Sequence, residues 1–438
     1  MDSSDESRML LYDRHDLHDF IKSSLPPETV KNLFGDGKGG LLTMSVKVNL
    51  NNPRSIPQDL NHSHYTALSI KNAICDLVRD LHPDGIRPSV ELDDPDVPLV
   101  AILLGHDDNR NMESGASLAL YRSLSPPSSL HKRGYRNQGP IHKAAMKESL
   151  AAGLLRLADI PHHLQRQKML SLNSDGRGNK LVIVDPMAGS GSLIIEAALM
   201  ATDLAPALMR IKCGLQGHSL PPVVRWKEET QPQQDNDGDT TERTCLNQWK
   251  QILMEATTRA KQGIADVRNN KWIGFHANDI HGGAVDCMED SLVQAGLSDL
   301  VQVYNEDCYD LDLDGKLQSQ DSDSRSTEDS SYIVVTNPPW GVRLTEDVAE
   351  SWEGLRHFLR DTCPKDRTEA WVLSGDKKAT TQLKLRRDKM IPLQTGEQHL
   401  RWIQYTIGSP PSSPSPSLKT SGKDSNKKNA RAHHDDEW

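Results

Sequence analysis

The apolar positions of this chain fall into two groups with different organisation. In the first group, residues 42–49 alternate between apolar and polar as a strand does, and residues 65–81 carry apolar side chains at helical spacing. Two further apolar runs, 99–104 and 116–122, are typical of strands. The sequence therefore predicts a small α+β module over residues 1–128.

The second group alternates short strands with helices, which is the pattern of a parallel sheet covered on both faces. We expect an α/β domain with a Rossmann-like, doubly wound sheet over residues 129–407. The predicted strands are 181–184, 271–276, 300–304 and 332–335, and the predicted helices are 144–157, 193–200 and 283–295.

Three polar segments interrupt or follow this pattern. Residues 228–244 are rich in Gln, Asp and Thr, and residues 314–330 are rich in Ser and Asp. We interpret both as surface insertions, which a folded domain tolerates at small cost in loop-closure entropy. Residues 408–438 are rich in Ser, Pro and Lys, and are predicted to be a disordered tail.

A glycine-rich turn follows the strand 181–184. It reads DPMAGSGS over residues 185–192 and leads into a helix, which is the usual cradle for a nucleotide-type ligand in a doubly wound sheet. Its spacing is neither G-x-G-x-x-G nor G-x-x-x-x-G-K-[ST], which argues against a dinucleotide or a triphosphate. A short turn with a nearby acid suits S-adenosylmethionine (SAM); a βα turn without ligand is the alternative. The candidate cofactor residues are Asp185, Pro186, Gly189 and Gly191.

Acidic residues follow the next two predicted strands. Asp279 comes after the strand 271–276, where an acid can accept hydrogen bonds from ribose hydroxyls. Asp307 comes after the strand 300–304, where it could accept from an adenine amino group. Taken singly, each is better explained as a helix cap or an exposed loop charge. Their order behind the glycine turn favours a cofactor site.

The four residues Asn337-Pro338-Pro339-Trp340 follow the strand 332–335. The prolines lack N–H groups and fix φ, so the backbone is rigid and can present its carbonyls. Asn337 adds an amide oxygen as acceptor, and Trp340 adds a flat apolar face. This set suits a planar amino group on a base, although a simple turn is the alternative. The hypothesis requires this turn and the glycine turn to face one another across one cleft.

These segments resemble a known family. The segments DPMAGSGS…EAA at 185–198 and TNPPWGVRL at 336–344 are similar to those of the RNA guanine-N2 methyltransferases that carry a THUMP domain. The segments HSHYTAL at 62–68 and SLHKRGYR at 129–136 are similar to segments of the bacterial enzymes that modify large-subunit rRNA. The family usually has Cys at Ala188, Thr at Ser192 and an acid at His281, and its N-terminal module is longer. Whether the native chain begins further upstream therefore stays open.

The resemblance implies a class I SAM-dependent methyltransferase with a THUMP-like RNA-binding module, acting on N2 of a guanosine in large-subunit rRNA. Asn337 and the Pro338 carbonyl would accept the two amino protons, and Trp340 would stack on the base. A tRNA guanosine is an open alternative; adenine N6, a protein glutamine and a non-catalytic RNA-binding relic are less favoured. The candidate phosphate contacts are Lys132, Arg133, Arg136 and Lys143, with a solvated charged face as their simpler explanation.

Composition changes this picture little. The chain has 61 acidic and 51 basic residues and a net charge of -10, so overall charge does not favour a nucleic-acid partner, although the acid lies in patches. Its six cysteines form no C-x-x-C pair, which predicts free thiols and no metal site. No apolar run reaches the roughly 18 residues that span a bilayer. With an acidic start unlike a targeting peptide, a cytoplasmic location is expected, or an organelle if the N-terminus is longer.

Overall fold

The computed structural model describes most of the 438-residue chain. The described residues are 10–36, 39–107, 114–124, 131–136, 145–172, 180–206, 208–209, 245–313, 315, 330–340, 348–395 and 398–408. The predicted insertion at 228–244 lies outside them, as does the one at 314–330 apart from residues 315 and 330. The predicted tail lies outside them beyond residue 408.

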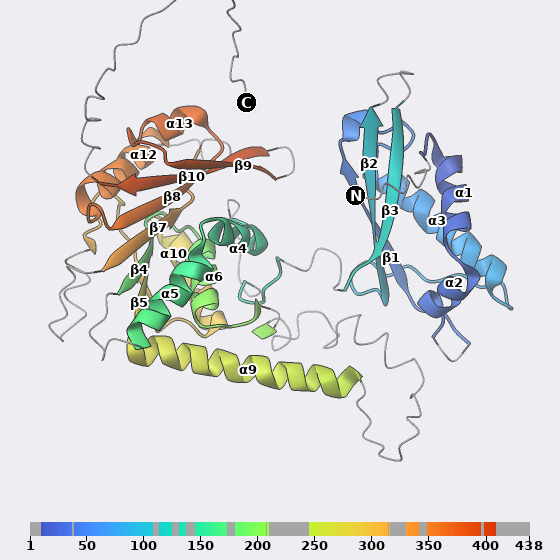
Figure 1. Ribbon diagram of the computed structural model, residues 1–438, viewed down its shortest axis with the longest axis horizontal. Coiled ribbons are helices and arrows are strands. Elements are labelled where there is room, and N and C mark those ends of the chain that lie inside the picture. The colour runs from blue at the N-terminus through green and yellow to red at the C-terminus, as the bar shows by residue number, and fades with distance from the viewer. Residues whose placement is uncertain are drawn as a thin grey trace, which may run out of the picture.

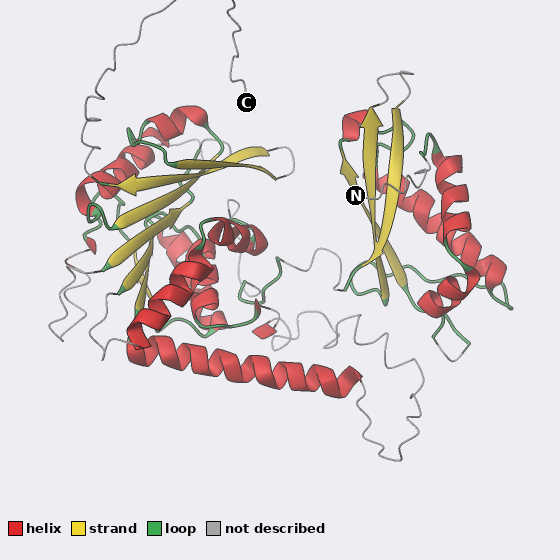
Figure 2. Cartoon of the chain, in the orientation of Figure 1, coloured by secondary structure: helices red, strands yellow, loops and turns green. Residues whose placement is uncertain are grey.

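The N-terminal module is a three-stranded sheet with helices on one face (Figures 1 and 2). Strand β1 pairs parallel with β2, and β2 pairs antiparallel with β3. The expected α+β module is present, with two helices ahead of β1 that the sequence analysis does not predict. Its elements are α1 (Arg14–Ser24), α2 (Pro27–Phe34), β1 (Met44–Asn51), the 3-10 turn η1 (Pro53–Ser55), α3 (Ser63–Leu81), β2 (Val97–Asp107) and β3 (Ser114–Arg122).

Alternation and helical spacing build the core of this module. Leu99, Ala101 and Leu103 point to the same face of β2 and are almost fully buried. Helix α3 buries Ile70 and Ile74, four residues apart, in the same hydrophobic cluster. The apolar faces of β2 and α3, which the strand and helix periodicities of the sequence predict, therefore pack against each other in one hydrophobic core.

The second domain is built on a seven-stranded sheet of order β6-β5-β4-β7-β8-β10-β9. The pairings from β6 to β8 are parallel, whereas β10 is antiparallel to both β8 and β9. The strands are β4 (Leu181–Asp185), β5 (Ile273–Asn278), β6 (Val301–Tyr304), β7 (Ser331–Thr336), β8 (Thr368–Ser374), β9 (Lys389–Thr395) and β10 (Gln398–Ile407). The helices are α4 (Glu148–Leu157), α5 (Ile160–Leu172), α6 (Ser192–Ala201), α9 (Cys245–Asn270), α10 (Gly282–Ala295), α12 (Val348–His357), the π-helical turn η3 (Phe358–Thr362) and α13 (Lys377–Thr381).

Both faces of this sheet are buried, as its continuous apolar strands require. Along β4, Leu181 and Ile183 join a cluster with helices α4, α5 and α6. Val182 and Val184 join a second cluster with α12 and η3. Figure 1 shows these helix groups on the two sides of the sheet. The doubly wound α/β fold predicted from the sequence is confirmed.

Helix α4 begins later than its sequence predicts. It starts at Glu148 instead of residue 144, and Lys147 has extended backbone with φ -65 and ψ 135. The Met146 carbonyl accepts hydrogen bonds from Arg136 and from the Ser192 hydroxyl. Side chains of Arg136 and Ser192 therefore bind the backbone carbonyl just ahead of the helix. The spacing of apolar residues in the sequence could not predict these contacts.

No helix in the described part of the chain is both long and apolar enough to cross a membrane.

Candidate cofactor and substrate site

The two motifs leave the same edge of the sheet from neighbouring strands. Strands β4 and β7 are parallel partners, with Val184 opposite Val334. The glycine turn therefore starts at Asp185 and the Asn-Pro-Pro-Trp turn starts after Thr336, side by side at the carboxyl ends. The strand order also reverses here, since the chain fills one side of β4 with β5 and β6 before it crosses to β7. Such switch points are where doubly wound sheets bind ligands.

Two glycines shape the turn after β4. Gly189 has φ +55 and Gly191 has φ +76, in the left-handed region that favours glycine. A Cβ on Gly191 would lie 2.6 Å from Cγ of Met288, so helix α10 closes this side. A Cβ on Gly189 would meet no atom within 4 Å. The turn is therefore packed at Gly191 and opens on free space at Gly189.

The end of β5 anchors this turn. The Ala188 N–H donates to the Asn278 carbonyl at 2.8 Å, and the Gly189 N–H donates to Oδ2 of Asp279 at 2.7 Å. Oδ1 of Asp279 accepts from the His281 N–H at 3.0 Å. The Asp279 carboxylate is therefore buried beside Gly189 with one hydrogen bond on each oxygen, and each oxygen keeps a further lone pair.

Asn278 ties three loops together, a role that the sequence analysis misses. Its side-chain amide donates to the Pro186 carbonyl at 3.1 Å and to the Glu306 carbonyl at 3.0 Å. Its Oδ1 accepts from the Glu306 N–H at 3.1 Å. The loops after β4, β5 and β6 are thus joined by one buried side chain. Its only signal in the sequence is its place at the end of a strand.

Asp185, the last residue of β4, is buried, with 1% of its surface exposed. Burial raises the pKa of its carboxyl to about 8, and the nearby Asp279 charge adds to the rise. The Met187 N–H, which donates to Oδ1 at 3.2 Å, and the adjacent Thr336 hydroxyl lower the pKa in part. The Thr336 hydroxyl itself makes no hydrogen bond of normal geometry among the described residues. Without a cation nearby, Asp185 is therefore mostly protonated at neutral pH.

Asp307 lies at the end of β6 but is exposed. Its Oδ1 accepts from the Tyr309 N–H at 2.9 Å, which is the local turn contact that a loop acid commonly makes. The assignment of Asp307 to an adenine amino group stays a prediction.

The Asn-Pro-Pro-Trp turn is braced by two indoles. The Trp340 Nε1–H donates to Oδ1 of Asn337 at 3.1 Å, and the Trp352 Nε1–H donates to the Pro339 carbonyl at 2.7 Å. The Trp340 ring lies against Gly375, where any Cβ would collide with it. Asn337 is only half-buried, and no described residue donates to the carbonyl of Pro338. Oδ1 of Asn337 and the carbonyl of Pro338 are thus two hydrogen-bond acceptors held in fixed positions after β7.

The connector between the two domains, of which the structure describes residues 131–136, turns two of its predicted phosphate contacts inward. Arg133 pairs with Glu196 on α6 through Nε at 3.1 Å and Nη2 at 3.3 Å. Arg136 donates to the hydroxyls of Ser190 and Ser192. Lys132 is exposed, whereas Lys143 lies outside the described residues. Of the three that the structure describes, Lys132 is the one left available to a phosphate.

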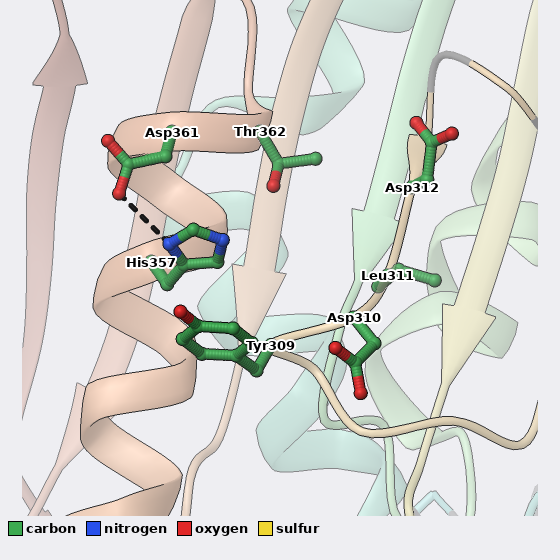
Figure 3. A pocket seen from close by; sticks show the side chains of 7 residues that line it. All are labelled: Tyr309, Asp310, Leu311, Asp312, His357, Asp361 and Thr362. Carbon is green, nitrogen blue, oxygen red and sulfur yellow. Dashed lines mark hydrogen bonds and ion pairs between the residues drawn. The ribbon is translucent and has the colours of Figure 1, made fainter.

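A separate cavity of about 340 Å³ lies beside the β6 loop (Figure 3). The Tyr309 and His357 rings stack with centroids 4.0 Å apart, and Nδ1 of His357 contacts Oδ2 of Asp361 at 3.0 Å. Its acidic lining disfavours a phosphate, and it contains none of the predicted site residues. The lining residues are Tyr309, Asp310, Leu311, Asp312, His357, Asp361 and Thr362.

Comparison with known families gives two matches. A family described as "RMKL-like, methyltransferase domain" matches residues 169–404, which is more than half of the chain. A THUMP domain matches residues 28–106.

Curated relatives share similarity over most of this chain. A ribosomal RNA large subunit methyltransferase K/L from Allochromatium vinosum is 29% identical over 355 residues, which are 80% of this chain and 38% of that protein. Its counterpart from Syntrophotalea carbinolica is 30% identical over 353 residues, which are 80% and 40% of the two chains. The chain thus spans about two fifths of the length of these relatives.

Solved structures share the fold. A possible methylase from Clostridium difficile 630 matches with a TM-score of 0.56 and 18% identity, over 92% of this chain and 83% of that one. The protein SMU.472, solved in complex with SAH, matches with a TM-score of 0.52 and 16% identity, over 92% and 82%.

The two turn glycines form a matched pair for mutation. We expect Gly191→Ala to destabilise the protein more than Gly189→Ala, because only the former adds a steric clash to the cost of a left-handed backbone, itself about 1–2 kcal/mol. Thermal or denaturant unfolding of the two variants measures the difference. Equal losses would show that Met288 moves aside without cost.

Proposed function

The chain belongs to the RMKL-like methyltransferase family, and on this basis we propose that it transfers a methyl group from SAM to the exocyclic N2 of a guanosine in RNA. Large-subunit rRNA is the proposed substrate, because the curated relatives carry that name. One observation carries the proposal: the glycine turn and the Asn-Pro-Pro-Trp turn leave adjacent parallel strands at the point where the strand order reverses.

The residues around the glycine turn fit SAM. The free space at Gly189 lies where a ligand would approach the backbone, and the Asp279 carboxylate lies beside Gly189. Asp279 keeps lone pairs for ribose hydroxyls, while Asp185 would ionise beside the α-ammonium group. When bound, SAM supplies an electrophilic methyl group on a sulfonium. Pro186 would act through its carbonyl, which already fixes the turn to Asn278.

The residues after β7 fit a planar amino group. Oδ1 of Asn337 and the Pro338 carbonyl would accept its two protons, which localises the nitrogen lone pair and directs it at the methyl group. Pro339 holds the turn rigid through its contact with Trp352. The Trp340 N–H fixes which amide atom of Asn337 is the oxygen, and leaves that oxygen a second lone pair. Trp340 would supply an apolar surface for a base swung out of its stack.

An RNA substrate fits the N-terminal module. The THUMP match over residues 28–106 supports RNA over DNA or a protein glutamine, and the exposed Lys132 at the connector could contact a phosphate. They do not separate rRNA from tRNA, which the first experiment below does. An rRNA substrate would fit a location in the cytoplasm or in an organelle that has its own ribosomes.

The substrate is tested by incubating the full chain with labelled SAM and separate pools of unmodified rRNA, tRNA and DNA. We expect label in large-subunit rRNA, and N2-methylguanosine as the product in nucleoside mass spectrometry. Label confined to tRNA would move the proposal to a tRNA guanosine. N6-methyladenine as the product would overturn it.

Asn337→Ala should abolish methylation while SAM still binds. We expect a loss of at least about 100-fold in kcat, because acceptors that orient a reacting group are typically worth that much. Trp340→Phe keeps an aromatic ring but removes the indole N–H, so its loss should be smaller. Single-turnover kinetics with RNA, alongside calorimetric binding of SAH, measure both effects. An Asn337→Ala enzyme with unchanged kcat would refute this mechanism.

Cofactor affinity should rise with pH up to about 8. Below that pH the buried Asp185 carboxyl is protonated, and binding a cation beside it requires loss of the proton. Calorimetry in buffers of different ionisation enthalpy should therefore detect proton release at neutral pH. Asp185→Asn cannot titrate, so its weaker binding should lose this dependence. Equal pH profiles for the two proteins would contradict the role of Asp185.

A further inference from the structure

A largely buried arginine from the connector, Arg136, contacts the glycine turn. Nη2 of Arg136 donates to the Ser190 hydroxyl at 2.9 Å and also to the Ser192 hydroxyl. These two serines flank Gly191, the residue at which the turn enters helix α6. We propose that Arg136 is a positioning residue for the cofactor-binding turn. This inference rests on the proposed use of that turn for SAM.

The guanidinium group is itself held from the other side. Its Nη1 donates to the Met146 carbonyl at 2.7 Å and lies 3.7 Å from a carboxylate oxygen of Glu148. The side chains of Arg136 and Glu148 are only 12% and 9% exposed. Since a planar guanidinium presents several donors in a fixed geometry, one side chain can link the start of α4 to the start of α6.

This link complements the anchors on β5. The β5 end holds residues 188 and 189 through backbone N–H groups, and Arg136 holds residues 190 and 192 through hydroxyls. The turn contains two glycines with left-handed backbone, whose freedom would otherwise be large. A turn that is fixed before the ligand arrives loses less conformational entropy on binding. The contacts of Arg136 should therefore increase the affinity for the cofactor.

A second arginine of the same connector provides the matched control. Arg133 forms its ion pair with Glu196, which also accepts from the Tyr135 hydroxyl at 3.1 Å. Glu196 lies on α6 with 2% of its side chain exposed, and its carboxylate accepts from Arg133 and Tyr135 of the connector. Loss of the ion pair between Arg133 and Glu196 should weaken the packing of the connector on α6 and leave the conformation of the glycine turn unchanged.

The test measures SAH binding to the full chain by calorimetry, together with melting temperature. The variants are Arg136→Lys, Ser190→Ala, their double mutant and Glu196→Gln. Lysine keeps the positive charge for Glu148 but cannot reach four acceptors at once. We expect Arg136→Lys to raise the Kd of SAH roughly tenfold, as for the loss of a buried charge-assisted hydrogen bond. Ser190→Ala should raise it less, and the double mutant should be no weaker than Arg136→Lys alone.

Glu196→Gln should lower the melting temperature but leave the Kd of SAH unchanged. In methylation assays, Arg136→Lys should raise KM for SAM while kcat at saturating SAM is retained. If Arg136→Lys fails to fold, Ser190→Ala and Ser192→Ala test the same contacts from the other side. An unchanged Kd in the arginine variant, or in both serine variants, would overturn the inference alone. Failure of the unmutated protein to bind SAH would instead overturn the proposed function.

Discussion

The parallel pairing of β4 with β7 is the constraint on which the rest of this structure depends. Their register sets Val184 opposite Val334, so the chain leaves both strands at the same edge. Neither motif could serve a transfer reaction alone, because a donor and an acceptor must meet within bonding distance. The motifs lie far apart in the sequence, and the sheet brings them together through backbone hydrogen bonds between the two buried strands that precede them.

Buried polar side chains then hold the loops in place at that edge. Asn278 joins three loops, Asp279 holds the Gly189 N–H, and Arg136 holds two serines from the connector. Burying a polar side chain costs free energy when its hydrogen-bonding atoms lack partners. The loops are therefore favoured in the arrangement that gives these atoms their partners. The sheet determines where the candidate site lies, and the hydrogen bonds of these side chains determine the conformation of its loops.

The sequence predicts part of the fold, because the segments of β1 and α3 show clear periodicity and the segments of β4 to β7 are short apolar runs. It leaves α1, α2 and the strands β8 to β10 unpredicted. It also identifies both motifs, since glycine and proline act through local backbone geometry. It does not predict Asn278, whose role exists only once three loops meet. Nor does it show that Arg133 and Arg136 face inward, because a run of basic residues looks the same whether it is solvated or paired with carboxylates from a distant helix. The late start of α4 follows from the same contacts.

The contact between Trp340 and Gly375 has a consequence for sequence change within this lineage. The indole rests where a side chain at residue 375 would stand, so even a methyl group there would displace the ring. A smaller aromatic group at position 340 would relieve that crowding. The two positions are therefore epistatic. A substitution of Gly375 is tolerated only after Trp340 has been replaced by a residue with a smaller side chain.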